Sequence, residues 1–175
     1  MAGRTVFHCH VAVSLDGMIA RPDRSFDWLM PYPPEEFGFA AFIAGVDAVL
    51  MGRGTYEAVR GMGEWPHPDK PTIVLTRRPL PDPPPLVEAR VGDPAAVAAE
   101  LEARGCARVW VDGGGEVVRQ MLAIGKLDRL EMALIPRVLG AGIPLFPPGT
   151  PETGLRLVSA APRSGGALHL VYERV

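Results

Sequence analysis

Three short segments rich in glycine or basic side chains have the composition of anion-binding turns. Each follows a run of apolar residues typical of a β-strand, and the segments span residues 52–55, 76–78 and 113–116. Glycine allows positive φ and lets a ligand touch the main chain. A helix that begins directly after such a turn adds free N–H groups and a positive dipole end, which favour an anion. The alternative for each segment is a tight connection that binds nothing.

The clearest of these turns is the triple glycine Gly113, Gly114 and Gly115. The residues before it, 108–111, alternate polar with large apolar side chains, as a strand does. After it, apolar residues recur at helical spacing over 117–122. Strand, glycine turn and helix together are the geometry of a phosphate-binding turn. We therefore interpret this segment as the turn that holds the pyrophosphate of a dinucleotide.

Side chains in the other two turns would complement phosphate. Arg53 can pair with it, and Thr55 can cap the following helix and donate a hydrogen bond. Arg77 and Arg78 follow a strand at a position where an acidic residue selects NAD and arginine accommodates the extra phosphate of NADP. Two arginines favour NADP, and the alternative is a solvated basic turn.

His8 and His10 are two residues apart in the first predicted strand, so they share one face of it. That spacing would suit a metal ion, but the sequence offers no further ligand nearby. We therefore interpret them as core or edge histidines and predict no metal site. Asp16 and Gly17 form a turn signal just past the end of this strand, where ligands of open α/β sheets bind.

Alternation of strand and helix patterns predicts an α/β fold. The predicted strands span residues 6–14, 46–51, 71–76, 86–91, 108–111 and 127–135, and the predicted helices span 34–45, a short stretch from Tyr56, 94–104 and the stretch after Gly115. Residues 34–45 would bury Phe37, Ala40, Ala41 and Ala44. Residues 155–161 and 167–174 predict a C-terminal antiparallel hairpin.

These elements predict a mixed, mostly parallel sheet with helices on both faces, which is a three-layer αβα sandwich. In a parallel sheet the carboxyl ends of the strands lie at one edge. The three glycine or basic turns would therefore meet there, and this coincidence favours a dinucleotide site over three unrelated turns.

Length, charge and cysteine content limit the number of domains, the kinds of partner and the compartment that we expect. The length of 175 residues predicts one domain, 1–175. A formal net charge of −2 gives no reason to expect nucleic acid or an anionic membrane surface as a partner. Two cysteines make neither a disulfide framework nor a zinc site, and they fit a reducing cytoplasm. No signal-peptide pattern and no apolar stretch of membrane-spanning length is present.

Five pieces of the chain, in this order, resemble the dihydrofolate reductase superfamily. They read VAVSLDGMIA, DAVLMGRGTYE, TIVLTRRPL, VWVDGGGEVVRQML and IPRVLGAGIPLF, and they span nearly the whole sequence. The closer resemblance is to the reductase domain of the bifunctional riboflavin-biosynthesis deaminase-reductase. Together the pieces imply the dihydrofolate reductase-like fold and the use of NADPH, and they say much less about the substrate.

The resemblance implies a role for each matching residue of the cofactor site. The nicotinamide would be bordered by Ala12 and Ile19, and phosphates would be held by Gly52, Arg53, Gly54 and Thr55. The 2′-phosphate would be met by Thr76 and Arg77, or by Arg78 in place of Arg77. The pyrophosphate and the nearby ribose would be bound by Gly113, Gly114, Gly115, Glu116 and Val117.

Three acidic residues are implied as catalytic candidates. In dihydrofolate reductases an acidic residue near the start of the first helix binds the pterin and helps to protonate it. Counting back from the MGR turn of this chain places Glu36 at the corresponding position. In the riboflavin enzymes the aspartate of SLDG and an acidic residue before the glycine turn face the substrate, and here these are Asp16 and Asp112. We expect Glu36 first, and Asp16 or Asp112 next, to orient the substrate or route a proton.

The chain departs from both branches. Met18 stands where the riboflavin enzymes have lysine after SLDG, and residues 34–45 carry no positive charge to pair with a sugar phosphate. The arginine that binds the glutamate tail of folate is also not evident.

We therefore predict an NADPH-dependent reductase that transfers hydride to a C=N or C=O of a small, heterocyclic substrate. The alternatives are a 5-amino-6-(5-phosphoribosylamino)uracil reductase and, from another class, an NADP-binding module without catalysis. The resemblance also implies a homodimer. The terminal hairpin and the sheet edge are where we expect its interface, because unpaired edges need covering.

Overall fold

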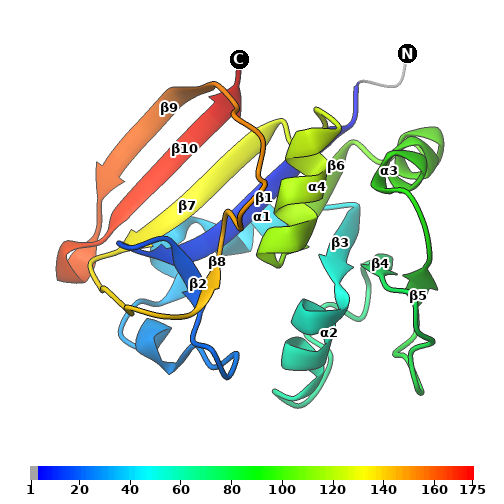
Figure 1. Cartoon of the computed structure of the whole chain (residues 1–175), viewed down its shortest axis with the longest axis horizontal. Coiled ribbons are helices and arrows are strands. Elements are labelled where there is room, and N and C mark those ends of the chain that lie inside the picture. The colour runs from blue at the N-terminus through cyan, green and yellow to red at the C-terminus, as the bar shows by residue number, and fades with distance from the viewer. Residues whose placement is uncertain (1–3) are drawn as a thin grey trace.

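One eight-stranded sheet runs through the computed structural model, which describes residues 4–175 (Figure 1). Its strands are β1 (Val6–Ser14), β3 (Ala48–Gly52), β4 (Thr72–Leu75), β5 (Val87–Arg90), β6 (Arg108–Gly113), β7 (Arg129–Ile135), β9 (Leu155–Pro162) and β10 (Leu168–Arg174). They lie in the order β5-β4-β3-β6-β1-β7-β10-β9.

The first strand of the chain lies in the middle of this sheet. β1 pairs in parallel with β6, where His8 lies opposite Trp110, and with β7, where His8 lies opposite Arg129. Phe7 and Cys9 are fully buried, since β1 is covered on both faces. The β-branched and apolar residues of this strand predict this central position, and the structure confirms it.

The sheet is parallel from β5 to β7 and antiparallel beyond it. β10 runs antiparallel to β7, and β9 runs antiparallel to β10 and forms the outer edge. The predicted mixed, mostly parallel sheet with a C-terminal hairpin is therefore confirmed.

In the described part of the chain, four α-helices pack around the sheet: α1 (Phe39–Ala44), α2 (Arg53–Arg60), α3 (Pro94–Ala103) and α4 (Gly115–Ala123). α3 follows its predicted signals closely, because the Asp93 carboxylate accepts from the Ala95 N–H at 2.9 Å and Gly105 beyond the helix has a φ of +77°. Shorter 3₁₀ turns are η1 (Asp27–Leu29), η2 (Pro34–Phe37) and η3 (Ser164–Gly166).

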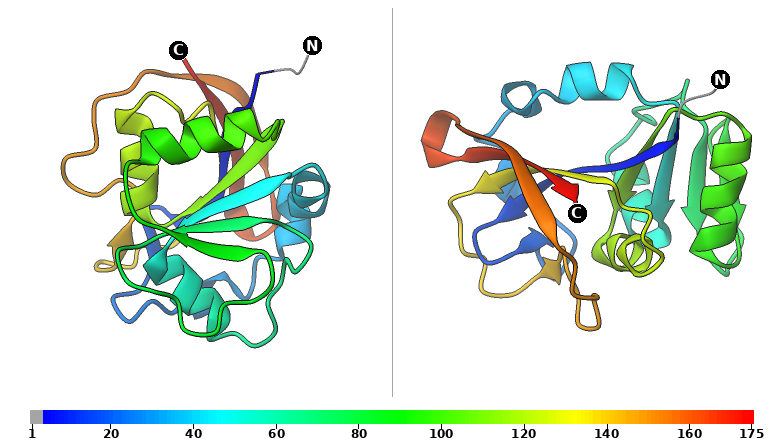
Figure 2. Two further views of the ribbon diagram at one scale, coloured as in Figure 1. Left: turned by 90° about the vertical axis from the view of Figure 1, so that its right-hand side faces the viewer. Right: turned by 90° about the horizontal axis from the view of Figure 1, so that it is seen from above.

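Two buried clusters place helices on both faces of the sheet, as Figure 2 shows for α1 on one side and α3 and α4 on the other. Apolar side chains of α3 and α4, such as Leu101 and Met121, pack with Phe7 and Cys9 of β1. Phe42 of α1 and Tyr56 of α2 belong to a separate cluster with alternate residues of β3 and β4. The predicted three-layer sandwich is confirmed.

The predicted helix over residues 34–45 is wrong as one continuous helix. η2 ends at Gly38, which has a φ of +72°, and α1 begins after it. The break changes the phase of the turns, so Phe37 and Phe42 are buried while the three alanines of the predicted apolar face are exposed.

The helix expected from Tyr56 begins earlier, at Arg53. Gly52 is its N-cap residue, and no side chain caps the helix. The expectation that Thr55 caps this helix is therefore wrong: Thr55 lies within the first turn of the helix.

A second, two-stranded sheet was absent from the prediction. β2 (Met18–Ala20) pairs antiparallel with β8 (Ile143–Pro144). The Leu145 N–H also donates to Gly17 O at 2.9 Å. This small sheet packs beside the beginning of α4, where a Cβ at Gly115 would collide with the backbone carbonyl oxygens of Pro144 and Leu145.

We predict that Gly115→Ala lowers the free energy of unfolding by about 1–3 kcal/mol, because the backbone of β8 must move to admit the methyl group. Urea unfolding measures the change. Gly61→Ala is the matched control and should be nearly neutral, since its Cβ would lie at ordinary contact distances of 3.4 Å from Ala58 O and 3.5 Å from Glu57 O. Equal stabilities of the two variants would contradict this account of Gly115.

Candidate cofactor and substrate site

The carboxyl ends of β3, β4 and β6 lie side by side. Gly52 is paired with Leu75 of β4, and Met51 is paired with Gly113 of β6. The turns 52–55, 76–78 and 113–116 therefore meet at one edge of the sheet, as the sequence predicts.

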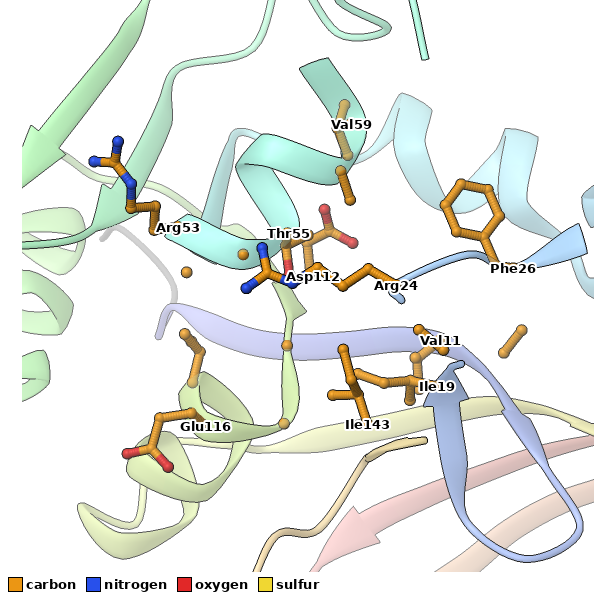
Figure 3. A pocket seen from close by; sticks show the side chains of 18 of the residues that line it. Val11, Ile19, Arg24, Phe26, Arg53, Thr55, Val59, Asp112, Glu116 and Ile143 are labelled. Carbon is orange, nitrogen blue, oxygen red and sulfur yellow. The ribbon is translucent and has the colours of Figure 1, made fainter. Parts of the chain in front are cut away.

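A cavity of about 550 Å³ opens at this edge (Figure 3). Its size is within the range of small-molecule sites. It lies between the glycine turns, β2 and β8, and the loop that carries Arg24 and Phe26. Its lining residues are His10, Val11, Ala12, Ile19, Ala20, Arg24, Phe26, Leu29, Gly52, Arg53, Gly54, Thr55, Ala58, Val59, Met62, Leu75, Asp112, Gly114, Gly115, Glu116, Val117, Gln120 and Ile143.

The cavity brings together most, but not all, of the residues that the sequence selects. The predicted residues that line it are Ala12, Ile19, Gly52, Arg53, Gly54, Thr55, Asp112, Gly114, Gly115, Glu116 and Val117. The predicted residues outside its lining are Asp16, Glu36, Thr76, Arg77, Arg78 and Gly113.

The triple-glycine turn leads directly into α4. Gly113 has a φ of +105°, its peptide bond to Gly114 is cis, and Gly114 is the N-cap residue of α4. The first amides of a helix have no partner within it, so the beginning of α4 offers N–H groups to a ligand. A Cβ at Gly114 would lie 3.6 Å from Thr55 Oγ1 and 3.7 Å from Ile19 Cδ1. Glycine thus keeps open the space between α4, α2 and β2.

Arg53 connects two of the turns. Its Nη1 donates to Arg78 O at 3.2 Å and to Pro79 O at 3.1 Å, and its Nε donates to Glu57 Oε1 at 2.7 Å. Arg53 therefore fixes the segment after β4 against α2. Arg77 and Arg78 are exposed beside this contact, at the rim of the site rather than inside it.

Of the three predicted catalytic candidates, Asp112 is the one that lines the cavity. It stands at the end of β6 and points into the space beside α2 (Figure 3). No hydrogen bond to its carboxylate is formed by the described residues, 4–175, and burial raises the pKa of Asp112 to about 7. A carboxyl group with such a pKa can hold and release a proton near neutral pH.

Glu36 lies away from the cavity. Its carboxylate accepts from the Ser164 hydroxyl at 2.6 Å and from the Ser164 N–H at 3.2 Å, at the tip of the C-terminal hairpin. The break at Gly38 separates η2 from α1 and leaves Glu36 beside the hairpin. The structure therefore gives Glu36 a contact that fixes the hairpin and no position at the cavity.

Asp16 is also occupied elsewhere. It accepts from Ser14 Oγ at 2.6 Å, from Leu139 N at 3.0 Å and from Gly140 N at 2.8 Å. These hydrogen bonds lower the pKa of Asp16 to about 2, and the one from Ser14 has the largest effect. A carboxylate so strongly stabilised is a poor proton donor at neutral pH, and its contacts join the turn after β1 to the loop after β7.

A buried group of imidazoles around Glu131 was missed by sequence reasoning. The interpretation of His8 and His10 as core histidines is confirmed by their burial, but the sequence did not show that Glu131 of β7 and His169 of β10 lie beside them. Nε2 of His8 is 2.9 Å from Glu131 Oε2, and Nε2 of His169 is 2.7 Å from Glu131 Oε1. The signal was present as one glutamate within the apolar strand pattern LEMALI.

Single ligand atoms of His10, Glu131 and His169 lie within 4.8 Å of one another, which raises the question of a metal ion. Nδ1 of His169 lies 3.1 Å from Arg163 Nη2, which can only donate, so the ring proton of His169 is on Nε2. Nε2 of His10 lies 3.0 Å from Phe37 O, which can only accept, so it also carries a proton. A ligating nitrogen must be free of its proton, and these partners therefore favour a hydrogen-bonded cluster.

The cluster adjoins the cavity through His10, which belongs to both. Burial lowers the pKa values of His8 and His10. Burial works to raise the pKa of Glu131, but the surrounding imidazole groups lower it to about 2. The cluster therefore places one ionised carboxylate behind the wall of the cavity, beside two rings, those of His8 and His10, whose pKa values are lowered by burial.

Among the described residues, no helix has the length and apolar character needed to cross a membrane. Comparison with known proteins then bears on the family. The chain is 38% identical over 176 residues to the "Uncharacterized protein YwjB" of Bacillus subtilis (strain 168), with 99% of each chain covered.

Solved structures agree with this fold. The "Putative riboflavin biosynthesis protein" of Shewanella sp. PV-4 superposes with a TM-score of 0.88 at 28% identity, covering 98% of this chain and 99% of that one. A dihydrofolate reductase from Enterococcus faecalis, complexed with NADP(H), superposes with a TM-score of 0.69 at 19% identity over 97% and 96% of the two chains. The fold is thus dihydrofolate reductase-like, as predicted. The model of the "RibD C-terminal domain" family matches residues 6–168, and the chain belongs to that family.

Proposed function

We propose that the protein is an NADPH-dependent reductase that transfers hydride to a C=N or C=O carbon of a small heterocyclic substrate. The observation that carries this proposal is the convergence of the turns after β3 and β6 on one cavity that also contains Asp112. Membership of the RibD C-terminal domain family and the dihydrofolate reductase-like fold support a reductase.

The donor set of the cavity suits a dinucleotide. Arg53, Thr55 and the first amides of α4 are the groups that would bind its phosphates, and Gly54 and Gly114 leave room for it beside the backbone. Arg77 and Arg78 at the rim would meet a 2′-phosphate, with Thr76 next to Arg53. Ala12 and Ile19 would border the nicotinamide. When bound, NADPH supplies the hydride.

The chain's own contribution to the chemistry is orientation and a proton. The apolar walls formed by Val11, Ile19 and Ile143 would exclude water around the reacting carbon (Figure 3). With a pKa of about 7, Asp112 is partly protonated at neutral pH and would donate a hydrogen bond or a proton to the substrate nitrogen or oxygen that gains negative charge. Asp16 and Glu36 would act only on the shape of the site, through the loops that they fix.

The substrate class follows from the same cavity. Phe26, Leu29, Val59 and Met62 add apolar surface, which suits a flat ring. Family membership also supports 5-amino-6-(5-phosphoribosylamino)uracil as a candidate substrate. The alternative of another class is an NADP-binding module without catalysis. It differs from both reductases because it would bind NADPH but would not oxidise it, whichever carbonyl or imine substrate is offered.

We predict that the protein binds NADPH at least tenfold more tightly than NADH, a difference of about 1.4 kcal/mol. Protein fluorescence quenching during titration measures both affinities. Arg77→Ala should remove most of this preference by weakening NADPH binding alone, since NADH has no 2′-phosphate. Arg60→Ala, at the far end of α2, is the control and should bind both as the wild type does. Failure of the wild type to bind either dinucleotide would refute the proposed cofactor.

We predict that Asp112→Asn lowers the rate of NADPH oxidation with an accepted substrate by about 10²-fold, because the proton donor is lost. The wild-type rate should fall as pH rises through about 7, and the variant should lose this limb of the profile. Glu116→Gln, which changes another carboxylate of the lining, is the control and should keep it. An unaltered profile in Asp112→Asn would exclude Asp112 as the donor.

The stability of Asp112→Asn as a function of pH also tests the raised pKa of Asp112. The folded state holds the Asp112 proton more tightly than the unfolded chain, so this carboxyl stabilises the fold at low pH and loses that contribution as pH rises to about 7. Above that pH, Asp112→Asn should therefore be more stable than the wild type by about 1–3 kcal/mol.

We also propose that the protein is a homodimer that pairs through β9. This edge strand is exposed along nearly its whole length and carries Leu155, Leu157 and Val158. Sedimentation should give twice the chain mass of 18.8 kDa for the wild type and a smaller mass for Leu157→Lys. Val138→Lys, at an apolar residue exposed in a loop, is the control and should stay dimeric. A wild-type monomer would refute the proposal.

A further inference from the structure

Arg24 has a backbone conformation that residues other than glycine rarely adopt. Its φ is 71°, and its N–H donates to Arg21 O at 2.9 Å while the Arg21 N–H donates to Ser25 O at 2.9 Å. Glycine would form the same turn without crowding from a Cβ. A side chain retained in this conformation at the wall of a cavity points to a role for that side chain.

The Arg24 side chain extends along the cavity to the first turn of α2 (Figure 3). Its Nη1 donates to Glu57 Oε2 at 3.1 Å. Its Cζ and Nη1 each lie 3.6 Å from the position that a Cβ of Gly54 would occupy. The guanidinium group therefore lies against Gly54, next to Thr55 at the beginning of the helix.

The charges at this point do not balance. Glu57 accepts from Arg24 and also from Arg53 Nε at 2.7 Å, so one carboxylate serves two guanidinium groups. One positive charge is left over, and the positive end of the α2 dipole lies beside it. Because the Arg24 side chain is 51% exposed, it can exchange Glu57 for an anionic ligand.

We propose that Arg24 binds a phosphate group in this cavity. The proposal rests on the proposed function for its choice of ligand and extends it by a residue outside the expected cofactor set. The phosphate has two sources, the pyrophosphate of the dinucleotide or the phosphate of a phosphorylated substrate. The second source is relevant because residues 34–45 carry no basic side chain, so Arg24 supplies a cation that this segment lacks.

Two variants test the proposal. Arg24→Gly removes the charge and suits the φ of the turn, and Arg24→Lys keeps a charge. At low salt, Arg24→Gly should bind NADPH about tenfold more weakly than the wild type, and the difference should shrink at high salt because screening weakens exposed charge pairs. Arg24→Lys should keep most of the affinity. The unfolding temperature of Arg24→Gly should equal or exceed that of the wild type, which separates a lost contact from a damaged fold.

The steady-state constants distinguish the two sources of phosphate. If Arg24→Gly leaves NADPH affinity unchanged and raises the KM for 5-amino-6-(5-phosphoribosylamino)uracil about tenfold, the ligand of Arg24 is the substrate phosphate. If both values match the wild type, the proposal is overturned.

A failure of the proposed function would give a different result from a failure of the Arg24 proposal. If the wild type binds no dinucleotide, titration with inorganic pyrophosphate decides the case for Arg24. Weaker pyrophosphate binding by Arg24→Gly than by the wild type would support an anion site there, and equal binding would overturn it.

Discussion

The partly buried carboxylate of Glu131, whose side chain is 13% exposed, is the constraint on which much of this structure depends. An ionised group within a sheet needs compensating partners, and here they lie on either side of β7: Nε2 of His169 in β10 is hydrogen-bonded to Glu131, and Nε2 of His8 in β1 lies 2.9 Å from it. His169 in turn accepts from Arg163, whose Nε donates to Glu36 O, and the Glu36 carboxylate holds Ser164. One line of polar contacts thus runs from the middle of the sheet to the hairpin tip, and His10 at its inner end also forms part of the cavity wall.

The three acidic residues that family resemblance selects differ in chemistry because their surroundings differ. Asp16 is surrounded by donors and stays ionised. Glu36 lies at the hairpin and holds a serine. Asp112 is half-buried and accepts no hydrogen bond from residues 4–175, and desolvation raises its pKa to about 7, so that it can hold a proton near neutral pH. All three residues were selected in the same way, as acidic residues at motif positions. Only their local environment distinguishes a carboxylate with a structural contact from a candidate proton donor.

The sequence predicted the parts of the fold that depend on local pattern. The central position of β1, the capped helix α3, the terminal hairpin and the common edge of the three turns all follow from burial periodicity, glycine and proline. Gly38 could not be identified as a break, because glycine is tolerated within helices and the hydrogen bond from His10 to Phe37 O joins distant segments. The β2–β8 pair and the Glu131 cluster were missed for the same reason, since each depends on contacts between segments far apart in the chain.

The sheet order also dictates when the fold can form. Among the strands described, the central one comes first in the chain, yet its neighbours β6 and β7 follow only about a hundred residues later. On the ribosome, β1 therefore waits with both edges unpaired until most of the chain has emerged, while β3, β4 and β5 can already pair with one another. High sequence separation of this kind slows folding and exposes apolar strands in the meantime. The nascent chain consequently has a long interval in which its N-terminal strand is a target for chaperones.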